Sequence, residues 1–351
     1  MRQSLTSASR SLLVATSFLA LALPASAAEN MTIVTFGGAF ESAVDEAFLG
    51  PFSKENDVTV VREQYDGGLA KLRGMVEAGN TTWDLIDLES NDAITGCDEG
   101  LLQKLDTKLL GDTSDFIEGA VLPCAVASMV WSTIYAYDTS RLTTAPTTIG
   151  DFFDTAKFPG KRGVRKSPKA ALEWALIADG VPVAEVYDLL GTPEGVDRAF
   201  AKLSTIKNDI VWWEAGSQAP QLLADGAVTM TMAYNGRIRT AQLDDKRPFE
   251  VVWDGQVYDY EWWGIPTGAK NEAVAAKFIE YASSPDNIWK LSNYIPYAPP
   301  RSSATDKVAK DVIPHLPTAP ENFKNALQVN SEFWADNLDS INNRFLNWLG
   351  Q

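Results

Sequence analysis

The sequence has few of the side chains from which metal centres and nucleophilic active sites are built. Its 351 residues include two cysteines, Cys97 and Cys124, and one histidine, His315. A structural zinc site takes four ligands, mostly Cys and His, so this set excludes an ordinary zinc centre. His315 stands between two prolines in IPHLP (residues 313–317), a segment typical of an exposed loop. We therefore expect no bound metal and no general-base histidine.

Common catalytic and nucleotide-binding motifs are also absent from the sequence. It contains no G-x-S-x-G elbow, no H-E-x-x-H pair, no P-loop and no G-x-G-x-x-G. These patterns place a nucleophile, a metal or a phosphate-binding loop in many enzymes. Their absence makes a binding protein a better hypothesis than an enzyme, and we expect no cofactor.

Positive charge is scarce. The chain has 30 basic and 46 acidic residues, a net charge of −16. A nucleic-acid-binding surface needs clusters of Lys and Arg, so this balance argues against nucleic acid as a partner. An acidic protein attracts cationic ligands weakly over long range.

Long apolar runs are missing beyond the first 28 residues. Those residues have Arg2 and Arg10, then a short apolar stretch over 12–23, then Ala25-Ser26-Ala27-Ala28. This order is typical of a cleaved signal peptide, and the stretch is short for a bilayer span of about 20 residues. We expect cleavage after Ala27 or Ala28 and export to the periplasm, with a membrane anchor as the alternative. The remaining chain would carry 28 basic and 46 acidic groups, a net charge of −18.

The cysteines are then an even pair in an exported protein. Oxidising compartments favour disulfides, so we predict one between Cys97 and Cys124. Two buried free thiols are the alternative.

The first third of the chain alternates strands and helices. Strands are predicted over 31–36, 58–61 and 83–88, with helices over 40–48 and 69–78 between them. This rhythm predicts an α/β fold with mostly parallel sheets. Gly37-Gly38 and the polar turn predicted over 89–92 follow strand ends, where such sheets collect ligands.

The rest of the chain predicts a second lobe and two crossings between lobes. A long strand over 130–139 leaves the first lobe, and DYEWWGIP (residues 259–266) leads back to it. Strands are also predicted near 210–212, 228–234 and 251–253, the last ending in a turn at Asp254-Gly255. Helices are predicted over 271–284 and in the final 30 residues. We assign 29–137 plus 264–305 to the first lobe, and 138–263 plus 306–351 to the second.

Aromatic residues are plentiful late in the chain, and two tryptophan pairs stand beside acids. These pairs are Trp212-Trp213, followed by Glu214, and Trp262-Trp263, preceded by Glu261. Aromatic faces bind alkyl chains and ammonium groups, the latter at about 0.5 to 2 kcal/mol each. In a strand, neighbouring side chains point to opposite faces, so at most one tryptophan of a pair is expected to face a ligand.

Several segments together resemble a known family. They are FGG (36–38), WDLI (83–86), MAYNGRI (232–238), WGIP (263–266) with GAKN (268–271), and YIPYAP (294–299). In their order and spacing the chain resembles periplasmic solute-binding proteins of ABC importers, in the spermidine/putrescine-binding branch. The resemblance implies a type II binding protein, in which two lobes are joined by crossover strands and close around a ligand.

The resemblance also implies a set of ligand-binding residues. In this family aromatic side chains sandwich the ligand and carboxylates hold its ammonium groups. The acid matching an ammonium anchor is Glu261, or Asp259 if the match shifts by two. Trp213 and Trp262 are the candidates from the tryptophan pairs, and Arg237 follows Asn235-Gly236 near the expected cleft. The remaining candidates matched to the family are Phe36, Ser90, Asp92, Tyr234, Tyr297 and Trp334.

One segment departs from the family pattern. A second acidic cluster belongs just before the helix expected near Ala170, but residues 165–170 read RKSPKA. A polyamine would lose its second anchor there, and a buried ammonium without a partner is costly. Arg237 could instead bind a carboxylate with two parallel hydrogen bonds; its alternatives are facing solvent or bonding Glu214.

These features predict a monomeric, periplasmic binding protein that delivers a small solute to ABC permease subunits. One acid and one arginine suit a short zwitterion, such as a γ-amino acid like GABA, or a monoamine. Putrescine or spermidine is the alternative ligand. A sensory binding protein and a hydrolase on the same fold are further alternatives.

Overall fold

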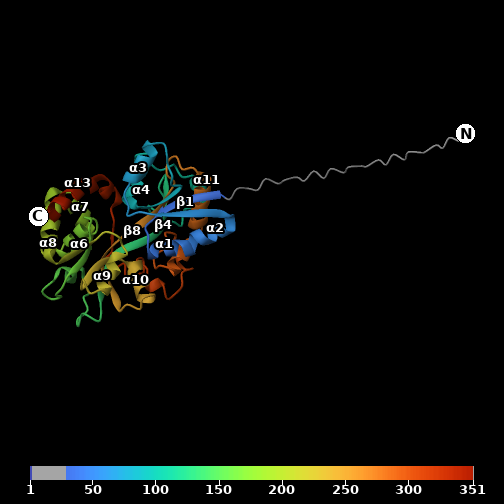
Figure 1. Cartoon of the computed structure of the whole chain (residues 1–351). Coiled ribbons are helices and arrows are strands. Elements are labelled where there is room, and N and C mark those ends of the chain that lie inside the picture. The colour runs from blue at the N-terminus through green and yellow to red at the C-terminus, as the bar shows by residue number, and fades with distance from the viewer. Residues whose placement is uncertain (2–28, 351) are drawn as a thin grey trace.

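A computed structural model describes Met1 and residues 29–350 (Figure 1). The predicted signal peptide lies outside these described residues, apart from Met1. Among the described residues the strands are β1 Glu29–Thr35, β2 Val58–Gln64, β3 Leu85–Glu89, β4 Ala125–Asp138, β5 Arg162–Arg165, β6 Ile210–Trp213, β7 Met230–Tyr234, β8 Phe249–Gly264 and β9 Leu327–Gln328.

The α-helices follow the same order along the chain. They are α1 Ala39–Val44, α2 Gly50–Asn56, α3 Ala70–Glu77, α4 Ser90–Asp98, α5 Ile149–Phe153, α6 Ala171–Ala178, α7 Val186–Leu190, α8 Pro193–Ser204, α9 Gln218–Ala224, α10 Asn235–Leu243, α11 Glu272–Ser283, α12 Ser302–Thr305 and α13 Ser331–Gly350.

One mixed sheet runs through both lobes. Its order is β2-β1-β3-β8-β4-β7-β5-β6, and β9 pairs with β8. The β2-β1-β3 and β7-β5-β6 groups are parallel, whereas β8 and β4 pair antiparallel with each other and with the neighbouring groups. We call β1–β3 with their helices the first lobe, and β5–β7 with theirs the second. The long strands β4 and β8 are the crossover strands that the sequence predicts; the exact lobe boundaries stay a prediction.

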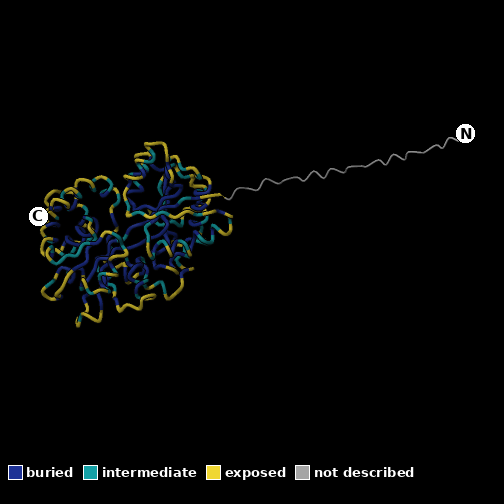
Figure 2. The backbone as a smooth tube through the Cα atoms, viewed as in Figure 1, coloured by how far each residue is buried: buried dark blue, intermediate teal, exposed yellow. Residues whose placement is uncertain are grey.

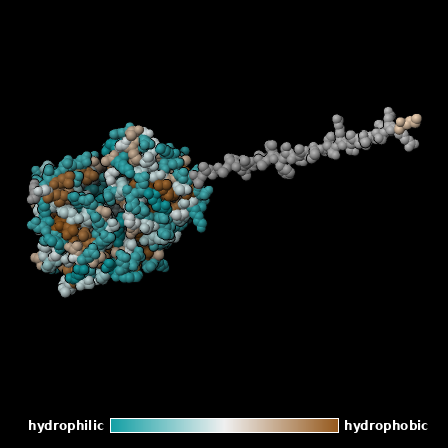
Figure 3. All heavy atoms as spheres, viewed as in Figure 1, coloured by the Kyte–Doolittle hydropathy of each residue, from teal (hydrophilic) through white to brown (hydrophobic). Residues whose placement is uncertain are grey.

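Three cores hold this arrangement. In the second lobe, one core packs β4, β7 and β8 against α6, α8 and α13, which gather on one side in Figure 1. In the first lobe, the sheet has one core on each face: α1, α2 and α11 cover one, and α3 and α4 cover the other. Figure 2 shows the buried segments concentrated along the central strands and exposed ones at the periphery. On the face seen in Figure 3, hydrophilic residues predominate around separate hydrophobic patches.

The tryptophan pair of β8 follows the expected alternation. Trp262 lies in the core beside α4, and Trp263 lies in the opposite core, packed edge-on against Phe278 with ring centroids 5.5 Å apart. Both are buried. The prediction that the two rings point to opposite faces is confirmed.

Three predicted element ends are wrong, each for a local reason. Residues 90–92 form the first turn of α4 rather than a turn, since β3 ends at Glu89 and the helix begins at once. Asp254-Gly255 does not end a strand: β8 continues, with a register shift against β4 in this region, and Gly255 has φ 70°. The helix predicted over 40–48 does not end before Gly50-Pro51, because a π-helical segment over Asp45–Leu49 leads directly into α2, which accepts the proline near its start.

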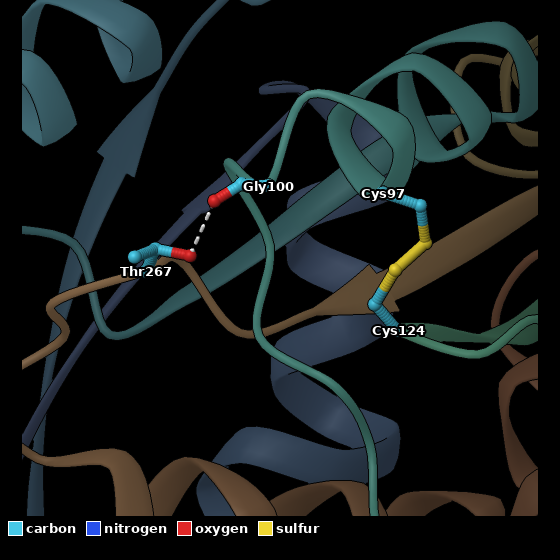
Figure 4. The surroundings of a disulfide bond; sticks show 4 residues. All are labelled: Cys97, Gly100, Cys124 and Thr267. Carbon is cyan, nitrogen blue, oxygen red and sulfur yellow. Dashed lines mark hydrogen bonds between the residues drawn. A yellow bond between two sulfur atoms is a disulfide. The ribbon is translucent and has the colours of Figure 1, made fainter.

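A disulfide joins Cys97 at the end of α4 to Cys124 just before β4 (Figure 4). Their Cα atoms are 5.8 Å apart, and both lie in the first lobe. Gly100, near Cys97, accepts a hydrogen bond from the Thr267 hydroxyl at 2.8 Å, which fastens the same region to the segment after β8.

Candidate binding site

A cavity of about 230 Å³ lies between the lobes, at the carboxyl ends of β1, β3 and β5. Its size suits a ligand smaller than a typical drug molecule. It is bordered by glycines, aromatic rings and charged groups from both lobes. The described residues that line it are Phe36, Gly37, Gly38, Phe40, Gln64, Tyr65, Asp66, Glu89, Met129, Trp131, Arg165, Glu214, Ala215, Gly216, Ser217, Tyr234, Arg237, Glu261 and Tyr297.

Aromatic rings form two walls of this cavity. In the first lobe, Phe36 packs on Tyr65 with ring centroids 4.9 Å apart. On the other side, Tyr234 meets Trp131 edge-on at 5.1 Å and Trp213 edge-on at 5.8 Å. Edge-to-face packing of this kind fixes ring orientation, which gives a preorganised apolar surface for an alkyl chain.

Arg237 brings a positive charge to the cavity from the first turn of α10. Its side chain is 7% exposed, and its Nη1 donates to the Gly37 carbonyl oxygen at 3.0 Å, across from the second lobe to the loop after β1. Its buried Nε has no hydrogen-bond partner within the described part of the chain. A Cβ atom at Gly38 would lie 2.9 Å from Arg237 Nη1, and one at Gly216 would lie 2.7 Å from its Nε. Glycine at both positions gives the guanidinium its room.

Glu89, the last residue of β3, is fully paired. Its Oε1 accepts from Arg165 Nη1 at 2.9 Å, and its Oε2 accepts from Lys169 Nζ at 2.6 Å. Lys169 Nζ also donates to Asn91 Oδ1 at 2.5 Å. Burial on its own raises the pKa of Glu89, but the charges of Arg165 and Lys169 outweigh burial and hold this pKa well below its usual range. Glu89 is therefore an ionised carboxylate already matched by two cations of the second lobe.

Glu261 on β8 lies directly opposite Glu89 in the neighbouring strand. It is 5% exposed and lines the cavity, yet its Oε1 has no partner among residues 29–350. Burial, and then the negative charges of Asp87, Glu89 and Asp259, raise its pKa well above the ordinary value. Asp87, on the same face of β3, also has both carboxylate oxygens unpaired in the described structure, and burial raises its pKa too. The cavity thus holds a buried acid whose charged form a ligand cation would stabilise.

Asp259 and Ser90 form a layer behind the cavity. The Ser90 hydroxyl donates to Asp259 Oδ1 and accepts from Trp262 Nε1 at 2.7 Å. Burial raises the pKa of Asp259 to about 7. Asp92 accepts from the Gly68 backbone N–H at 2.8 Å, which ties α4 to the loop before α3.

The structure places five of the eleven predicted ligand-binding residues on the cavity: Phe36, Tyr234, Arg237, Glu261 and Tyr297. Six lie outside its lining as the described residues form it: Ser90, Asp92, Trp213, Asp259, Trp262 and Trp334. Trp334 of α13 is fully buried, and its Nε1 donates to Glu173 Oε1 at 2.8 Å inside the second-lobe core. Trp213 supports the ring of Tyr234 from behind.

Sequence reasoning missed four important lining residues: Tyr65, Glu89, Trp131 and Arg165. Arg165 lies in the segment 165–170, which is basic where the family pattern has an acidic cluster. This replacement of acids by basic residues was the only sequence signal that pointed to Arg165. Trp131 lies on β4 directly opposite Asp259 of β8, a register that the sequence does not reveal. Glu89 belongs to the segment 89–92, which the sequence places at a strand end where ligands collect, but the family pattern matches Ser90 and Asp92 of this segment rather than Glu89.

The described residues contain no group of three His, Cys, Asp or Glu side chains arranged to hold a metal ion. Within residues 29–350, no helix is both long enough and apolar enough to cross a bilayer.

Residues 47–318 match the family model for bacterial extracellular solute-binding proteins. The chain belongs to this family. A γ-aminobutyric acid-binding protein of Pseudomonas aeruginosa is 44% identical over 331 residues, which cover 94% of each chain. The spermidine/putrescine-binding periplasmic protein of Escherichia coli is 22% identical over 323 residues, 86% of each chain. The predicted resemblance is thus confirmed.

Solved structures agree with the fold. The PBP MotA from A. tumefaciens B6 in complex with glucopine has a TM-score of 0.85 and 30% identity, covering 91% of this chain and 99% of that one. The structure described as the Atu4243-GABA receptor has a TM-score of 0.81 and 30% identity, and the match covers 92% of this chain and 98% of that one. The predicted fold class, a two-lobed α/β binding protein, is confirmed.

Proposed function

We propose that this chain is the substrate-binding component of an ABC importer and that it captures a γ-amino acid, such as GABA, between its lobes. The observation that carries the proposal is the charge pattern of the cavity. Glu261 is a buried acid with an unpaired oxygen, and Arg237 is a buried guanidinium with an unpaired Nε among the described residues. A short zwitterion supplies one opposite charge for each.

Each end of the ligand would be held by a charge-assisted hydrogen bond. The ammonium group would bind Glu261, and the carboxylate would bind Arg237, with Arg165 on the same wall. Such bonds contribute about 1.5 to 3 kcal/mol each. Between them, the methylene chain would lie against the rings of Tyr234 and Phe36. The name of the 44% identical relative supports the same ligand class.

Polyamines are the second candidate and are less well matched. The more distant relatives that are named for spermidine and putrescine keep this candidate open. However, both oxygens of Glu89, the other buried acid of the lining, are already paired with Lys169 and Arg165. The remaining lining acids, Asp66 and Glu214, are exposed to solvent. A dication would leave one charge buried without a partner, which is costly.

Export to the periplasm and delivery to permease subunits complete the proposal. Relatives described as periplasmic support the location. The basic start, short apolar stretch and Ala-x-Ala end of residues 1–28 are the signal that would direct it there. We expect the mature protein to act as a non-enzymatic monomer that presents its closed form to the permease.

Isothermal titration calorimetry with GABA, putrescine and spermidine tests the ligand. We expect GABA to bind in the micromolar range or tighter, and putrescine to bind at least about 100-fold more weakly. Tighter binding of putrescine than of GABA would refute the proposal.

In the same assay, Arg237→Ala should weaken GABA binding by about 100-fold while having little effect on the binding of butylamine, which has no carboxylate. Equal losses for both ligands would show that Arg237 does not hold the carboxylate.

A further inference from the structure

Two glutamates on neighbouring strands of the cavity have opposite surroundings. Glu89 and Glu261 are register partners of β3 and β8, so their side chains project from the same face of the sheet. Both line the cavity and both are nearly buried, 8% and 5% exposed. Their carboxylates would make a doubly negative wall if both were available to a ligand.

Lys169 prevents this together with Arg165. It is 8% exposed and does not belong to the described lining of the cavity, so its ammonium group reaches Glu89 from behind. It binds Glu89 Oε2 at 2.6 Å, while Arg165 binds Oε1 at 2.9 Å. Buried ion pairs at such distances are strong, because little water screens them. Each oxygen of Glu89 is therefore already bound to a cation, so its negative charge is offset before a second ammonium group arrives.

The net charge of the wall depends on Lys169. Once an ammonium group of the ligand pairs with Glu261, this carboxylate is ionised despite its burial. Glu89 and Glu261 then contribute two negative charges, and Arg165 and Lys169 contribute two positive charges. Burial favours the neutral form of the other acids nearby, Asp87, Asp92 and Asp259. With Lys169 the wall is balanced and suits a ligand with no net charge. Without it, the wall carries an excess negative charge and a partly released carboxylate.

We propose that Lys169, acting with Arg165, determines ligand specificity by withholding Glu89 from the ligand. The site then accepts one ammonium group at Glu261 and rejects a diamine. Lys169 is a positioning residue in this role, since it contacts Glu89 rather than the ligand. This inference rests on the proposed function, because it explains the preference of the same cavity for a zwitterion over a diamine.

The test is Lys169→Met, which keeps the side-chain volume and removes the charge. The control is Lys161→Met, which removes the same charge from a half-exposed lysine of the second lobe that pairs with Asp209. Each variant is titrated calorimetrically with GABA, putrescine and butylamine. For Lys169→Met we expect the ratio of putrescine affinity to GABA affinity to rise by about tenfold or more. The ratio of butylamine affinity to GABA affinity should rise by less. For the control we expect the wild-type ratios.

Two results would overturn the inference. One is a folded Lys169→Met protein whose putrescine-to-GABA ratio equals that of the wild type. The other is an equal gain for putrescine and butylamine, because a single ammonium group does not need Glu89. If Lys169→Met fails to fold, Lys169→Gln takes its place: it can still donate to Glu89 and Asn91 but has no charge. The double variant Glu89→Gln/Lys169→Met should lose the gain for putrescine.

The wild-type titration separates this inference from the proposed function. If the wild type prefers putrescine, the proposed function is wrong. If the wild type prefers GABA and Lys169→Met does not change the ratio, only the role of Lys169 is wrong.

Discussion

At the residue scale, the cavity shows how a buried carboxylate can be kept ionised. Glu89 is ionised because Arg165 and Lys169 supply two positive charges at hydrogen-bond distance. Glu261 has no such partner among the described residues, and burial raises its pKa. A ligand ammonium group would stabilise the ionised form of Glu261, as Arg165 and Lys169 stabilise that of Glu89. Because Glu261 lacks this partner before binding, the new ion pair contributes to the binding free energy.

Replacing Glu261 by Gln tests this at the level of a single charge. We expect the affinity for GABA to fall by about 10- to 100-fold, since a hydrogen bond between charged groups contributes about 1.5 to 3 kcal/mol. Calorimetry on Glu261→Gln gives the change directly. Glu250→Gln is the control, because Glu250 lies exposed near the far end of the same strand. An affinity equal to that of the wild type would remove Glu261 from the binding site.

Asp259 gives a prediction about pH and stability. Burial raises its pKa to about 7 in the folded state, against about 3.9 in an unfolded chain. Between these values the folded protein holds a proton that the unfolded chain has released, so the contribution of Asp259 to stability falls as pH rises, by up to about 1.4 kcal/mol per pH unit.

Asp259→Asn removes this titration while its Oδ1 can still accept from Ser90 and from the Tyr260 N–H. Urea unfolding at about pH 5 and about pH 8 measures the effect. We expect the variant to gain stability relative to the wild type as pH rises. The same difference in free energy of unfolding at both values would contradict the assignment.

The residues that line the cavity were only partly predictable from the sequence. Glu261 and Tyr234 could be found because local segments carry the family pattern. The ion pair between Glu89 and Arg165 joins residues 76 positions apart and forms only where the two lobes meet. No local pattern contains that information, so the basic segment after β5 looked like a missing anchor rather than the partner of an acid.

At the element scale, regular patterns were reliable and irregular ones were not. The helix predicted over 271–284 is α11, Glu272–Ser283, because its apolar residues recur at helical spacing. The predicted strand over 83–88 is β3, Leu85–Glu89. The errors fall where an element continues through a residue that usually ends one, such as Gly255 in β8 and Pro51 in α2.

Helix α10 offers a test of how tightly one element fits the cavity. A Cβ atom on Gly236 would lie 2.7 Å from the ring of Tyr297 and 2.5 Å from Ile295. Both side chains are buried, so Gly236→Ala should push the Tyr297 ring and cost about 1 to 3 kcal/mol of stability, with weaker GABA binding.

Gly74→Ala in α3 is the matched control, because nothing lies within 4 Å of its added Cβ atom. At an exposed helical position this change should raise stability by about 0.5 to 1 kcal/mol. Urea unfolding and calorimetry compare the two variants. If Gly236→Ala is as stable as the wild type and binds GABA equally well, Tyr297 has room to move.

At the scale of the whole molecule, the lobes are joined in two ways. The strands β4 and β8 run from one lobe to the other within a single sheet. Side chains then connect the lobes across the cavity, through Glu89 to Arg165 and Lys169 and through Arg237 to the Gly37 carbonyl. The strands join the lobes through the backbone, whereas the charged contacts join them through side chains that meet across the cavity.

The disulfide between Cys97 and Cys124 takes no part in these connections between the lobes, which gives a last prediction. Both cysteines lie in the first lobe, neither lines the described cavity, and the bond closes a loop over a separation of 27 residues. A cross-link over such a loop stabilises by about 3 kcal/mol, mainly by restricting the unfolded chain. Cys97→Ser/Cys124→Ser should therefore lower the free energy of unfolding by about that amount while leaving the GABA affinity within about twofold. A large loss of affinity in a folded double variant would mean that the disulfide region, from α4 to β4, also positions Glu89 or Trp131.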